Sequence, residues 1–132
     1  MIKSWILLAM GLMAAASAST AAAAEEGGLA LLKADTDISN TDSLQRGARN
    51  FMNYCSGCHS LKYLRYNRLA DDLKIPAKEL EHNLMFTSDK AFDGIDSAMP
   101  LDSVAWFGKP PPDLSLMARE RGVDYMYSYL KG

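Results

Sequence analysis

Tyr54-Cys55-Ser56-Gly57-Cys58-His59-Ser60 contains both cysteines of the chain and one of its two histidines. Cys-x-x-Cys-His is the pattern by which a c-type haem is attached: each thiol forms a thioether with a vinyl group of the porphyrin, and the adjacent imidazole binds the iron. On one helical turn and its exit, cysteines at this spacing share a face and the histidine follows at the height of the iron. The motif therefore predicts a haem c held covalently by Cys55 and Cys58, with His59 as an axial ligand of the iron.

Other uses of a cysteine pair fit this sequence less well. A structural zinc site needs a tetrahedral set of ligands, and the only histidine outside the motif is the distant His82. A thioredoxin-like dithiol opens a helix directly after a buried strand, whereas the residues before Cys55 have a helical pattern. A disulfide across so short a loop would stabilise little, and a chance pairing would leave two unused cysteines in an exported chain. The histidine directly after the second cysteine favours the haem interpretation over all of these.

The first 24 residues have the composition of an export signal. Lys3 gives a positively charged start, an apolar core runs from Trp5 to Met13, and an Ala/Ser-rich run ends at Ala24. We expect residues 1–24 to be a signal peptide, with an uncleaved membrane anchor as the alternative. Haem is attached covalently on the far side of the bacterial membrane, so the signal and the motif support each other.

Length and charge limit the possible functions. Of the 132 residues, those after the signal suffice for one small domain and not two. We expect a lead-in segment at residues 25–40 and one haem domain at residues 41–132. The formal net charge of −2 offers no basic field for nucleic acid, so we expect no nucleic-acid partner.

An amphipathic helix is expected to carry the first cysteine to the core. Residues 41–43 (Thr-Asp-Ser) offer N-capping side chains, and apolar residues then recur at helical spacing. These are Leu44, Ala48, Phe51 and Cys55. Gly47 lies on nearly the same face, where two explanations stay open: close approach of another helix, or a glycine that the helix tolerates.

Further elements are expected after the motif. Residues 61–69 mix aromatic and basic side chains, which is typical of amphipathic surface. Pro76 suits the first position of a helix reaching Met85, in which Leu80 and Leu84 share the buried face and His82 points to solvent. Residues 87–102 are rich in Asp, Ser and Gly and predict a surface loop.

The C-terminal part predicts two more helices. Asp113 can cap a helix from Leu114 to Arg121, which Gly122 would end. A last helix begins near Asp124. The chain is therefore predicted to be mostly α-helical.

Two stretches of the sequence resemble one known family. The first is Arg46–Leu61, which surrounds the haem motif, and the second is Pro111-Pro112-Asp113-Leu114-Ser115, running into Ala118–Gly122 and Asp124-Tyr125. The first alone indicates a c-type cytochrome, and the second narrows the resemblance. Together they resemble cytochrome c1, the haem subunit of ubiquinol-cytochrome c oxidoreductase (respiratory complex III), in its proteobacterial form.

The resemblance implies a class I cytochrome c-like haem domain and assigns roles to five residues. Cys55, Cys58 and His59 match the haem-binding residues of the family. Arg121 matches an arginine that pairs with a haem propionate, a role suited to its fixed charge and fork of donors. Tyr125 matches a tyrosine near the haem pocket.

The resemblance also implies a function and partners. Members of the family take one electron from the Rieske iron-sulfur protein and pass it to a soluble c-type cytochrome. They do so beside cytochrome b on the periplasmic side of the bacterial inner membrane, with no substrate chemistry of their own. A soluble periplasmic shuttle and a five-coordinate haem sensor or peroxidase-like protein are the alternative functions.

The end of the sequence departs from the family pattern. In the family an axial-methionine loop, a helix that packs on the first one and a C-terminal membrane anchor follow a segment like the one ending at Gly132. We therefore expect a C-terminally truncated member whose sixth iron ligand lies beyond residue 132. Met99, followed by a proline, is the less favoured candidate for that ligand.

Overall fold

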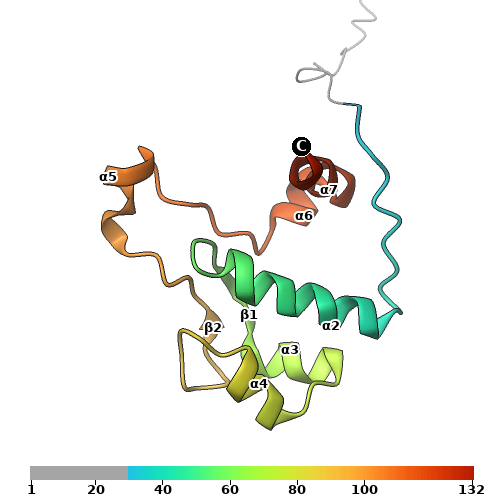
Figure 1. Ribbon diagram of the computed structural model, residues 1–132, viewed down its shortest axis with the longest axis vertical. Coiled ribbons are helices and arrows are strands. Elements are labelled where there is room, and N and C mark those ends of the chain that lie inside the picture. The colour runs from blue at the N-terminus through green and yellow to red at the C-terminus, as the bar shows by residue number, and fades with distance from the viewer. Residues whose placement is uncertain (1–29) are drawn as a thin grey trace, which may run out of the picture. The chain divides into compact units, whose positions relative to one another are not determined.

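Helices dominate the described part of the chain, which in this computed structural model is residues 30–132 (Figure 1). Residues 31–132 cluster as one unit. The elements are α2 (Thr41–Asn50), η1 (Phe51–Cys55), β1 (Leu61–Arg65), α3 (Tyr66–Leu73), α4 (Ala77–Asn83), β2 (Gly94–Ile95), η2 (Leu101–Ser103), α5 (Val104–Phe107), α6 (Met117–Arg121) and α7 (Val123–Lys131). The prediction of a mostly helical domain is confirmed, whereas the expected signal peptide at residues 1–24 lies outside the described residues. None of the helices within residues 30–132 has the length and apolarity that a membrane span requires.

The predicted helix that leads to the motif is confirmed, with a different cap and a wider last turn. The capping residue is Asn40, whose side-chain oxygen accepts a hydrogen bond from the Ser43 amide at 3.0 Å. After Asn50 the helix widens into the π-helix η1, closed by a bond of 3.0 Å from the Ser56 amide to the Phe51 carbonyl. Such wide turns are frequent at functional sites, and this one ends on Cys55, the first cysteine of the motif.

One side of α2 and η1 packs on the core. Met52 is fully buried, and Ala48 and Phe51 pack partly buried against the same cluster. At Gly47 no described atom lies within 4 Å of the place that a Cβ would occupy. Among the described residues no other helix approaches Gly47.

A two-stranded antiparallel sheet follows the motif, and the sequence does not predict it. In β1 and β2, Leu61 pairs with Ile95 and Arg65 with Gly94, with an irregularity between the two pairs. A Cβ on Gly94 would lie 2.6 Å from the Lys62 carbonyl oxygen, so the pairing at this point needs a glycine. The expectation of a plain surface loop at residues 87–102 is therefore wrong, because the segment contains β2 and the fully buried Ile95.

The core lies among η1, α3, α4 and β2. Its buried hydrophobic residues are Met52, Tyr66, Leu69, Leu80, Leu84 and Ile95. Burial of Leu80 and Leu84 confirms the predicted inner face of α4, although this helix begins after Pro76 and ends at Asn83. On its outer face the exposed His82 places Nδ1 2.9 Å from the Lys78 carbonyl, as expected for a solvated histidine.

The C-terminal helices differ from the prediction at their start. Helix α6 begins at Met117, after Leu116 as its cap, so Asp113 does not cap it. The expected end is confirmed: Gly122 has a φ of 86°, which favours glycine, and α7 follows immediately.

Residues of the lead-in segment are bound to α7 more firmly than a loose lead-in would be. The Leu32 amide donates to the Ser128 hydroxyl at 2.8 Å, and the Ala34 amide donates to the Asp124 carboxylate at 2.8 Å. The buried Ser128 hydroxyl in turn donates to the Asp124 carbonyl at 2.7 Å. Helix α7 thus provides two side-chain acceptors for an extended segment about ninety residues away in the sequence.

We expect Ser128→Ala to release this segment. The substitution removes the acceptor of the Leu32 amide. The loss of one hydrogen bond should make the state in which the lead-in segment is detached from α7 about fivefold more populated. Limited trypsin digestion should therefore cleave after the exposed Lys33 about fivefold faster than in the wild type. Ser39→Ala, which removes only a local bond to Asp37, should leave that rate unchanged; equal rates in all three proteins would contradict the assignment.

Candidate haem-attachment site

The motif forms a single helical turn that starts at Cys55, the last residue of η1. The Cys58 and His59 amides both donate to the Cys55 carbonyl, at 3.0 Å and 2.8 Å. Cys55 is half-buried, Cys58 is exposed, and both are free thiols. The disulfide alternative is thus not supported, and both sulfur atoms are available to form thioethers.

The imidazole of His59 is held by a backbone carbonyl from a distant part of the chain. Its Nδ1 lies 2.9 Å from the Pro112 carbonyl oxygen. A carbonyl can only accept, so Nδ1 carries the proton and Nε2 keeps its lone pair. A histidine that ligates a metal shows this arrangement, in which the outer hydrogen bond fixes the tautomer and the ring orientation.

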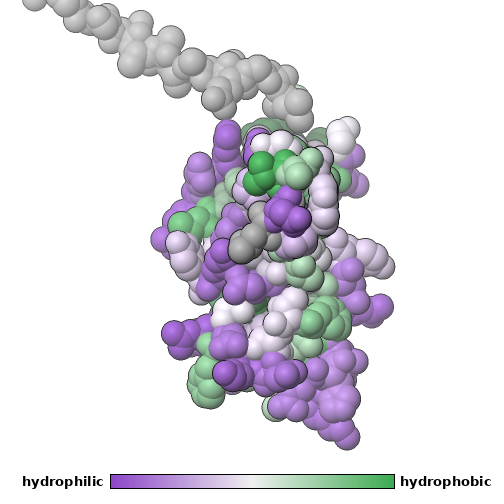
Figure 2. All heavy atoms as spheres, turned by 90° about the vertical axis from the view of Figure 1, so that its left-hand side faces the viewer, coloured by the Kyte–Doolittle hydropathy of each residue, from purple (hydrophilic) through white to green (hydrophobic). Residues whose placement is uncertain are grey.

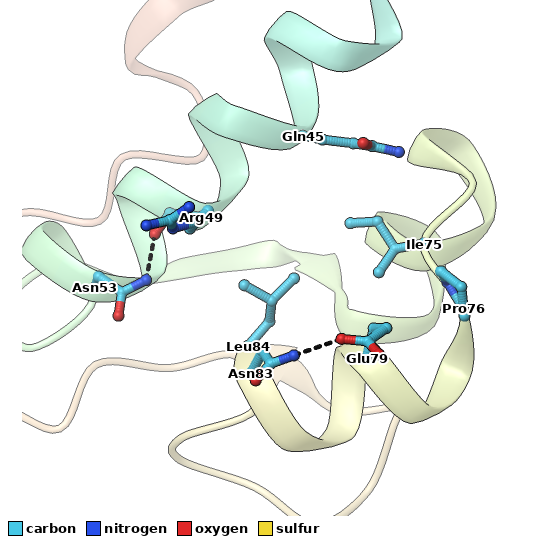
Figure 3. Close-up of a pocket in the computed structure, with 8 residues that line it drawn as sticks. All are labelled: Gln45, Arg49, Asn53, Ile75, Pro76, Glu79, Asn83 and Leu84. Carbon is cyan, nitrogen blue, oxygen red and sulfur yellow. Dashed lines mark hydrogen bonds between the residues drawn. The ribbon is translucent and has the colours of Figure 1, made fainter.

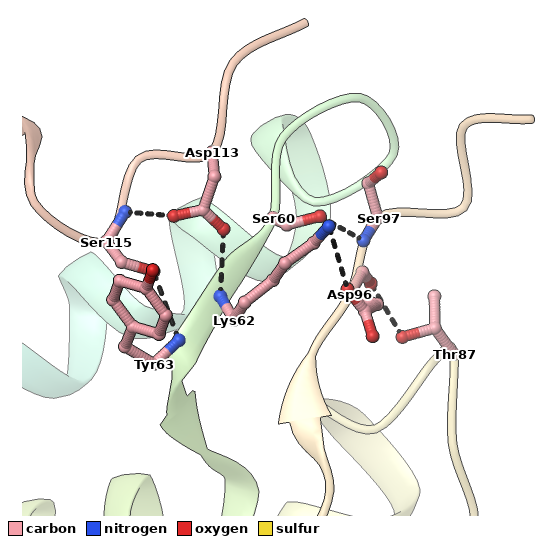
Figure 4. Close-up of polar contacts among 8 residues, drawn as sticks. All are labelled: Ser60, Lys62, Tyr63, Thr87, Asp96, Ser97, Asp113 and Ser115. Carbon is pink, nitrogen blue, oxygen red and sulfur yellow. Dashed lines mark hydrogen bonds and ion pairs between the residues drawn. The ribbon is translucent and has the colours of Figure 1, made fainter. Parts of the chain in front are cut away.

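On one side the motif loop is bound by the segment that follows β2. The Ser97 amide donates to the buried Ser60 hydroxyl at 2.8 Å (Figure 4). The Ala98 amide donates to the Ser56 carbonyl at 3.3 Å. These bonds place the segment that precedes Met99 against the motif loop. The role of Met99 as an iron ligand stays a prediction.

On the other side the motif is bound by the segment after the three prolines. The Leu114 amide donates to the Ser60 carbonyl at 2.9 Å. The two carboxylate oxygens of Asp113 accept from the Lys62 amide at 2.9 Å and from the Ser115 amide at 2.8 Å. Residues 60–63 are therefore held from both edges. Along the sequence, the Pro112 carbonyl that contacts His59 comes directly before this second set of bonds.

The carboxylate of Asp113 is stabilised in its charged form. Partial burial by itself raises the pKa of Asp113, but the hydrogen bonds from the Ser115 hydroxyl and amide and from the Lys62 amide, with the charge of Lys62, lower that pKa below its ordinary value. The carboxylate thus keeps both acceptor oxygens at neutral pH.

The C-terminal helices leave large apolar side chains exposed. Helices α5 and α6 contain no buried residue, and the only one in α7 is Ser128. Large side chains such as Trp106 and Phe107 are 61% and 60% exposed, and Figure 2, viewed from the α5 side, shows hydrophobic patches among polar ones. A porphyrin is a large apolar body, and burying such side chains against it would remove both surfaces from water. The cysteine pair and the bonded His59 fit a haem, and the exposed side chains of α5 are available to an apolar partner.

Zinc fits less well. Within residues 30–132 no group of three or more His, Cys, Asp or Glu side chains is placed to hold a metal ion. The motif on its own supplies too few ligands for a structural zinc site.

A separate pocket of about 530 Å³ lies between α2 and α4 (Figure 3). Gln45, Arg49 and Asn53 form one wall, and Glu79 and Asn83 belong to the other. Two of its polar side chains are bonded locally, the Asn53 amide to the Arg49 carbonyl and the Asn83 amide to the Glu79 carboxylate, and the Gln45 amide donates to the Leu73 carbonyl. No residue of the motif lines this pocket, so it is not the place of haem attachment.

The two remaining predicted residues lie against each other at the C-terminal end. The Arg121 guanidinium sits over the Tyr125 ring, 5.4 Å from its centroid. Tyr125 also stacks on Tyr129, with ring centroids 6.2 Å apart. The structure brings Arg121 and Tyr125 together, while their roles at a haem stay predictions.

Sequence reasoning missed the groups that hold His59. The Pro112 carbonyl is a backbone atom, which residue types do not reveal, and Asp113 was assigned to a helix cap. The available signal was the Pro-Pro-Asp-Leu-Ser motif itself, which carries the family resemblance without showing what it contacts.

The sequence of this chain matches known proteins. The model of the Cytochrome C1 family matches residues 34–99, half of the chain. The chain belongs to the cytochrome c1 family. Membership implies one covalently bound haem c, in agreement with the motif.

Several members of the family and one further protein are similar over most of this chain. Cytochrome c1 of Allochromatium vinosum is 52% identical over 115 residues, covering 86% of this chain and 47% of the relative. Cytochrome c1 of Rhodospirillum rubrum is 34% identical, over 85% of this chain and 50% of the relative. The ammonia monooxygenase gamma subunit of Nitrosomonas europaea is 40% identical, over 75% of this chain and 42% of that protein. The chain thus spans about half the length of the curated relatives it matches.

Proposed function

We propose that this chain belongs to the haem c subunit of a cytochrome bc1 complex. In this role it takes one electron from the Rieske iron-sulfur protein and passes it to a soluble c-type cytochrome, beside cytochrome b. The observation that supports the proposal most is the His59 imidazole, whose Nδ1 is bound by the Pro112 carbonyl at the exit of a Cys-x-x-Cys turn. Family membership supports the choice of complex.

Each motif residue has a distinct task in this proposal. Cys55 and Cys58 would hold the cofactor covalently, and His59 would present Nε2 to the iron with Nδ1 bound to the Pro112 carbonyl. The haem supplies reversible one-electron chemistry between ferrous and ferric iron. Arg121 pairs with a propionate, and Tyr125, which contacts Arg121, helps to fix that guanidinium. A fixed ligand and an apolar surround limit the rearrangement that accompanies each change of charge.

The proposed location is the periplasmic side of the bacterial inner membrane. Export by residues 1–24 would deliver the chain there, and attachment of the haem requires that compartment. The sixth iron ligand is proposed to come from outside residues 1–132.

The test is reduction of the haem by quinol in purified complex. With an affinity tag on the full-length gene product, we expect co-purification of a b-type cytochrome and a Rieske protein, and rapid reduction of the haem by added quinol. Extraction of the Rieske protein should slow that reduction by at least about a hundredfold, because the haem then has no direct electron donor. Each tenfold loss of rate corresponds to about 1.4 kcal/mol of barrier.

Dithionite provides the control, because it should reduce the haem equally with and without the Rieske protein. Two results together would contradict the proposal and favour a soluble shuttle. The tagged chain would purify without a b-type cytochrome or a Rieske protein, and adding a Rieske protein would not change the rate at which quinol reduces the haem. Stoichiometric carbon monoxide binding by the ferrous full-length protein would instead favour the five-coordinate alternative.

A further inference from the structure

Strand β1 and the motif before it are bonded along both edges, and the two edges differ in kind. On the β2 side the bonds are backbone pairing and the contacts of Ser97 and Ala98. Within residues 30–132 the other edge carries one backbone bond, from the Leu114 amide to the Ser60 carbonyl. Side chains complete that second edge.

Two side chains take the place of strand carbonyls on the second edge. The Asp113 carboxylate accepts from the Lys62 amide at 2.9 Å, and the Ser115 hydroxyl accepts from the Tyr63 amide at 3.2 Å (Figure 4). The second oxygen of Asp113 accepts from the Ser115 amide at 2.8 Å, which closes a tight turn at Leu114. We call Asp113, Leu114 and Ser115 the clasp.

The clasp begins one residue after the carbonyl that binds His59. The Pro112 carbonyl is part of the peptide bond that joins Pro112 to Asp113, so its direction depends on how Asp113 is held. Pro110, Pro111 and Pro112 stiffen the chain on the other side. The peptide group opposite Nδ1 is thus fixed by proline rings before it and by the Asp113 carboxylate after it.

We propose that Asp113 is a positioning residue for the axial imidazole: its bonds to the Lys62 and Ser115 amides aim the Pro112 carbonyl at His59 Nδ1. Asp113 does not touch the imidazole and acts through Pro112. The inference rests on the proposed function, because it requires His59 to be an iron ligand. The sequence alone suggested a helix cap for this residue, and the structure assigns it to the ligand instead.

The expected effect follows from the chemistry of the imidazole. A strong hydrogen bond from Nδ1 makes Nε2 a better donor, and a better donor favours ferric iron. Loosening the clasp should therefore raise the midpoint potential. A partial loss of one hydrogen bond corresponds to about a threefold change in the equilibrium constant for reduction, which is about 28 mV at about 59 mV per tenfold for one electron.

The experiment compares three variants of the haem-loaded full-length protein. Asp113→Asn and Ser115→Ala should both raise the midpoint potential, and both should speed solvent exchange of the His59 Nδ1 proton in the reduced protein by at least about threefold. Removing a negative charge also raises a potential. Ser115→Ala separates geometry from charge, because it removes the hydroxyl that bonds the Tyr63 amide and the Asp113 carboxylate but leaves the carboxylate itself in place. Asp71→Asn on the exposed surface of α3 removes the same charge elsewhere and should change neither measurement.

The outcomes separate the inference from the proposed function. Unchanged proton exchange in both clasp variants would overturn the inference, as would a shift of potential in Asp113→Asn that Ser115→Ala does not share. If Asp113→Asn fails to accumulate, Ser115→Ala decides on its own. A wild-type protein without covalent haem would overturn the proposed function, and this is visible before any variant is measured.

Discussion

The Cys55→Ala, Cys58→Ala double variant is expected to lose its haem completely on denaturing electrophoresis, whereas the wild-type band keeps its haem stain. The physical reason is that a thioether survives denaturation, while axial coordination by His59 depends on the folded chain. Both sulfur atoms are free and at least partly accessible on the turn that starts at Cys55, the last residue of η1. The effect is a presence or absence of colour at equal protein load, with the protein amount checked by immunoblot.

The matched control for the double variant lies within the same turn. Gly57 stands between the two cysteines, and its Cβ position has no described atom within 4 Å. Gly57→Ala should therefore keep the stain. Colour retained in the double variant would show that these cysteines do not hold the cofactor, and the assignment of His59 would lose its basis.

Gly94→Ala is expected to give the largest loss of stability among alanine substitutions of the glycines within residues 30–132. The new Cβ would lie 2.6 Å from the Lys62 carbonyl oxygen, a backbone atom that cannot turn away. Separating β1 from β2 is the only relief, and it would also pull Ile95 out of the core. We expect a loss of about 2 to 3 kcal/mol in the free energy of unfolding, measured by urea denaturation of the haem-loaded protein.

Gly47→Ala provides the comparison for this prediction. The position is helical and open, so a methyl group costs nothing in packing and removes the backbone freedom of glycine. A gain of up to about 1 kcal/mol is expected. Equal unfolding midpoints for Gly94→Ala and the wild type would show that the strand pairing tolerates a side chain there.

The helical part of the fold was largely predictable, and the strand part was not. The α2 helix and the inner face of α4 at Leu80 and Leu84 follow from apolar residues at helical spacing. Strand β2 has only two residues, Gly94 and Ile95, so it is too short for an alternation of apolar and polar side chains to predict it. It exists because the motif loop and β1 offer unpaired backbone groups, which is a property of the folded chain.

The caps show the same limit at the level of single residues. Asn40 caps α2 where the sequence favoured the residues after it, a shift within the usual uncertainty of helix ends. Asp113 has the residue type of a cap and lies before an apolar run, yet its acceptors are used by Lys62 and Ser115. A short polar side chain bonds whichever amide the tertiary structure brings to it, so residue type alone could not decide between these roles.

The sequence by itself predicted the chemistry: Cys55, Cys58 and His59 indicate a haem c because covalent attachment and ligation depend on residue types at fixed local spacing. Only the tertiary structure decided how that chemistry is held. The Pro112 carbonyl at His59, the Asp113 clasp on Lys62 and the lead-in segment on Ser128 all join residues more than fifty positions apart. Such contacts are hydrogen bonds between backbone groups and distant partners, and a backbone group is the same at every residue, so its partner is set by the path of the chain.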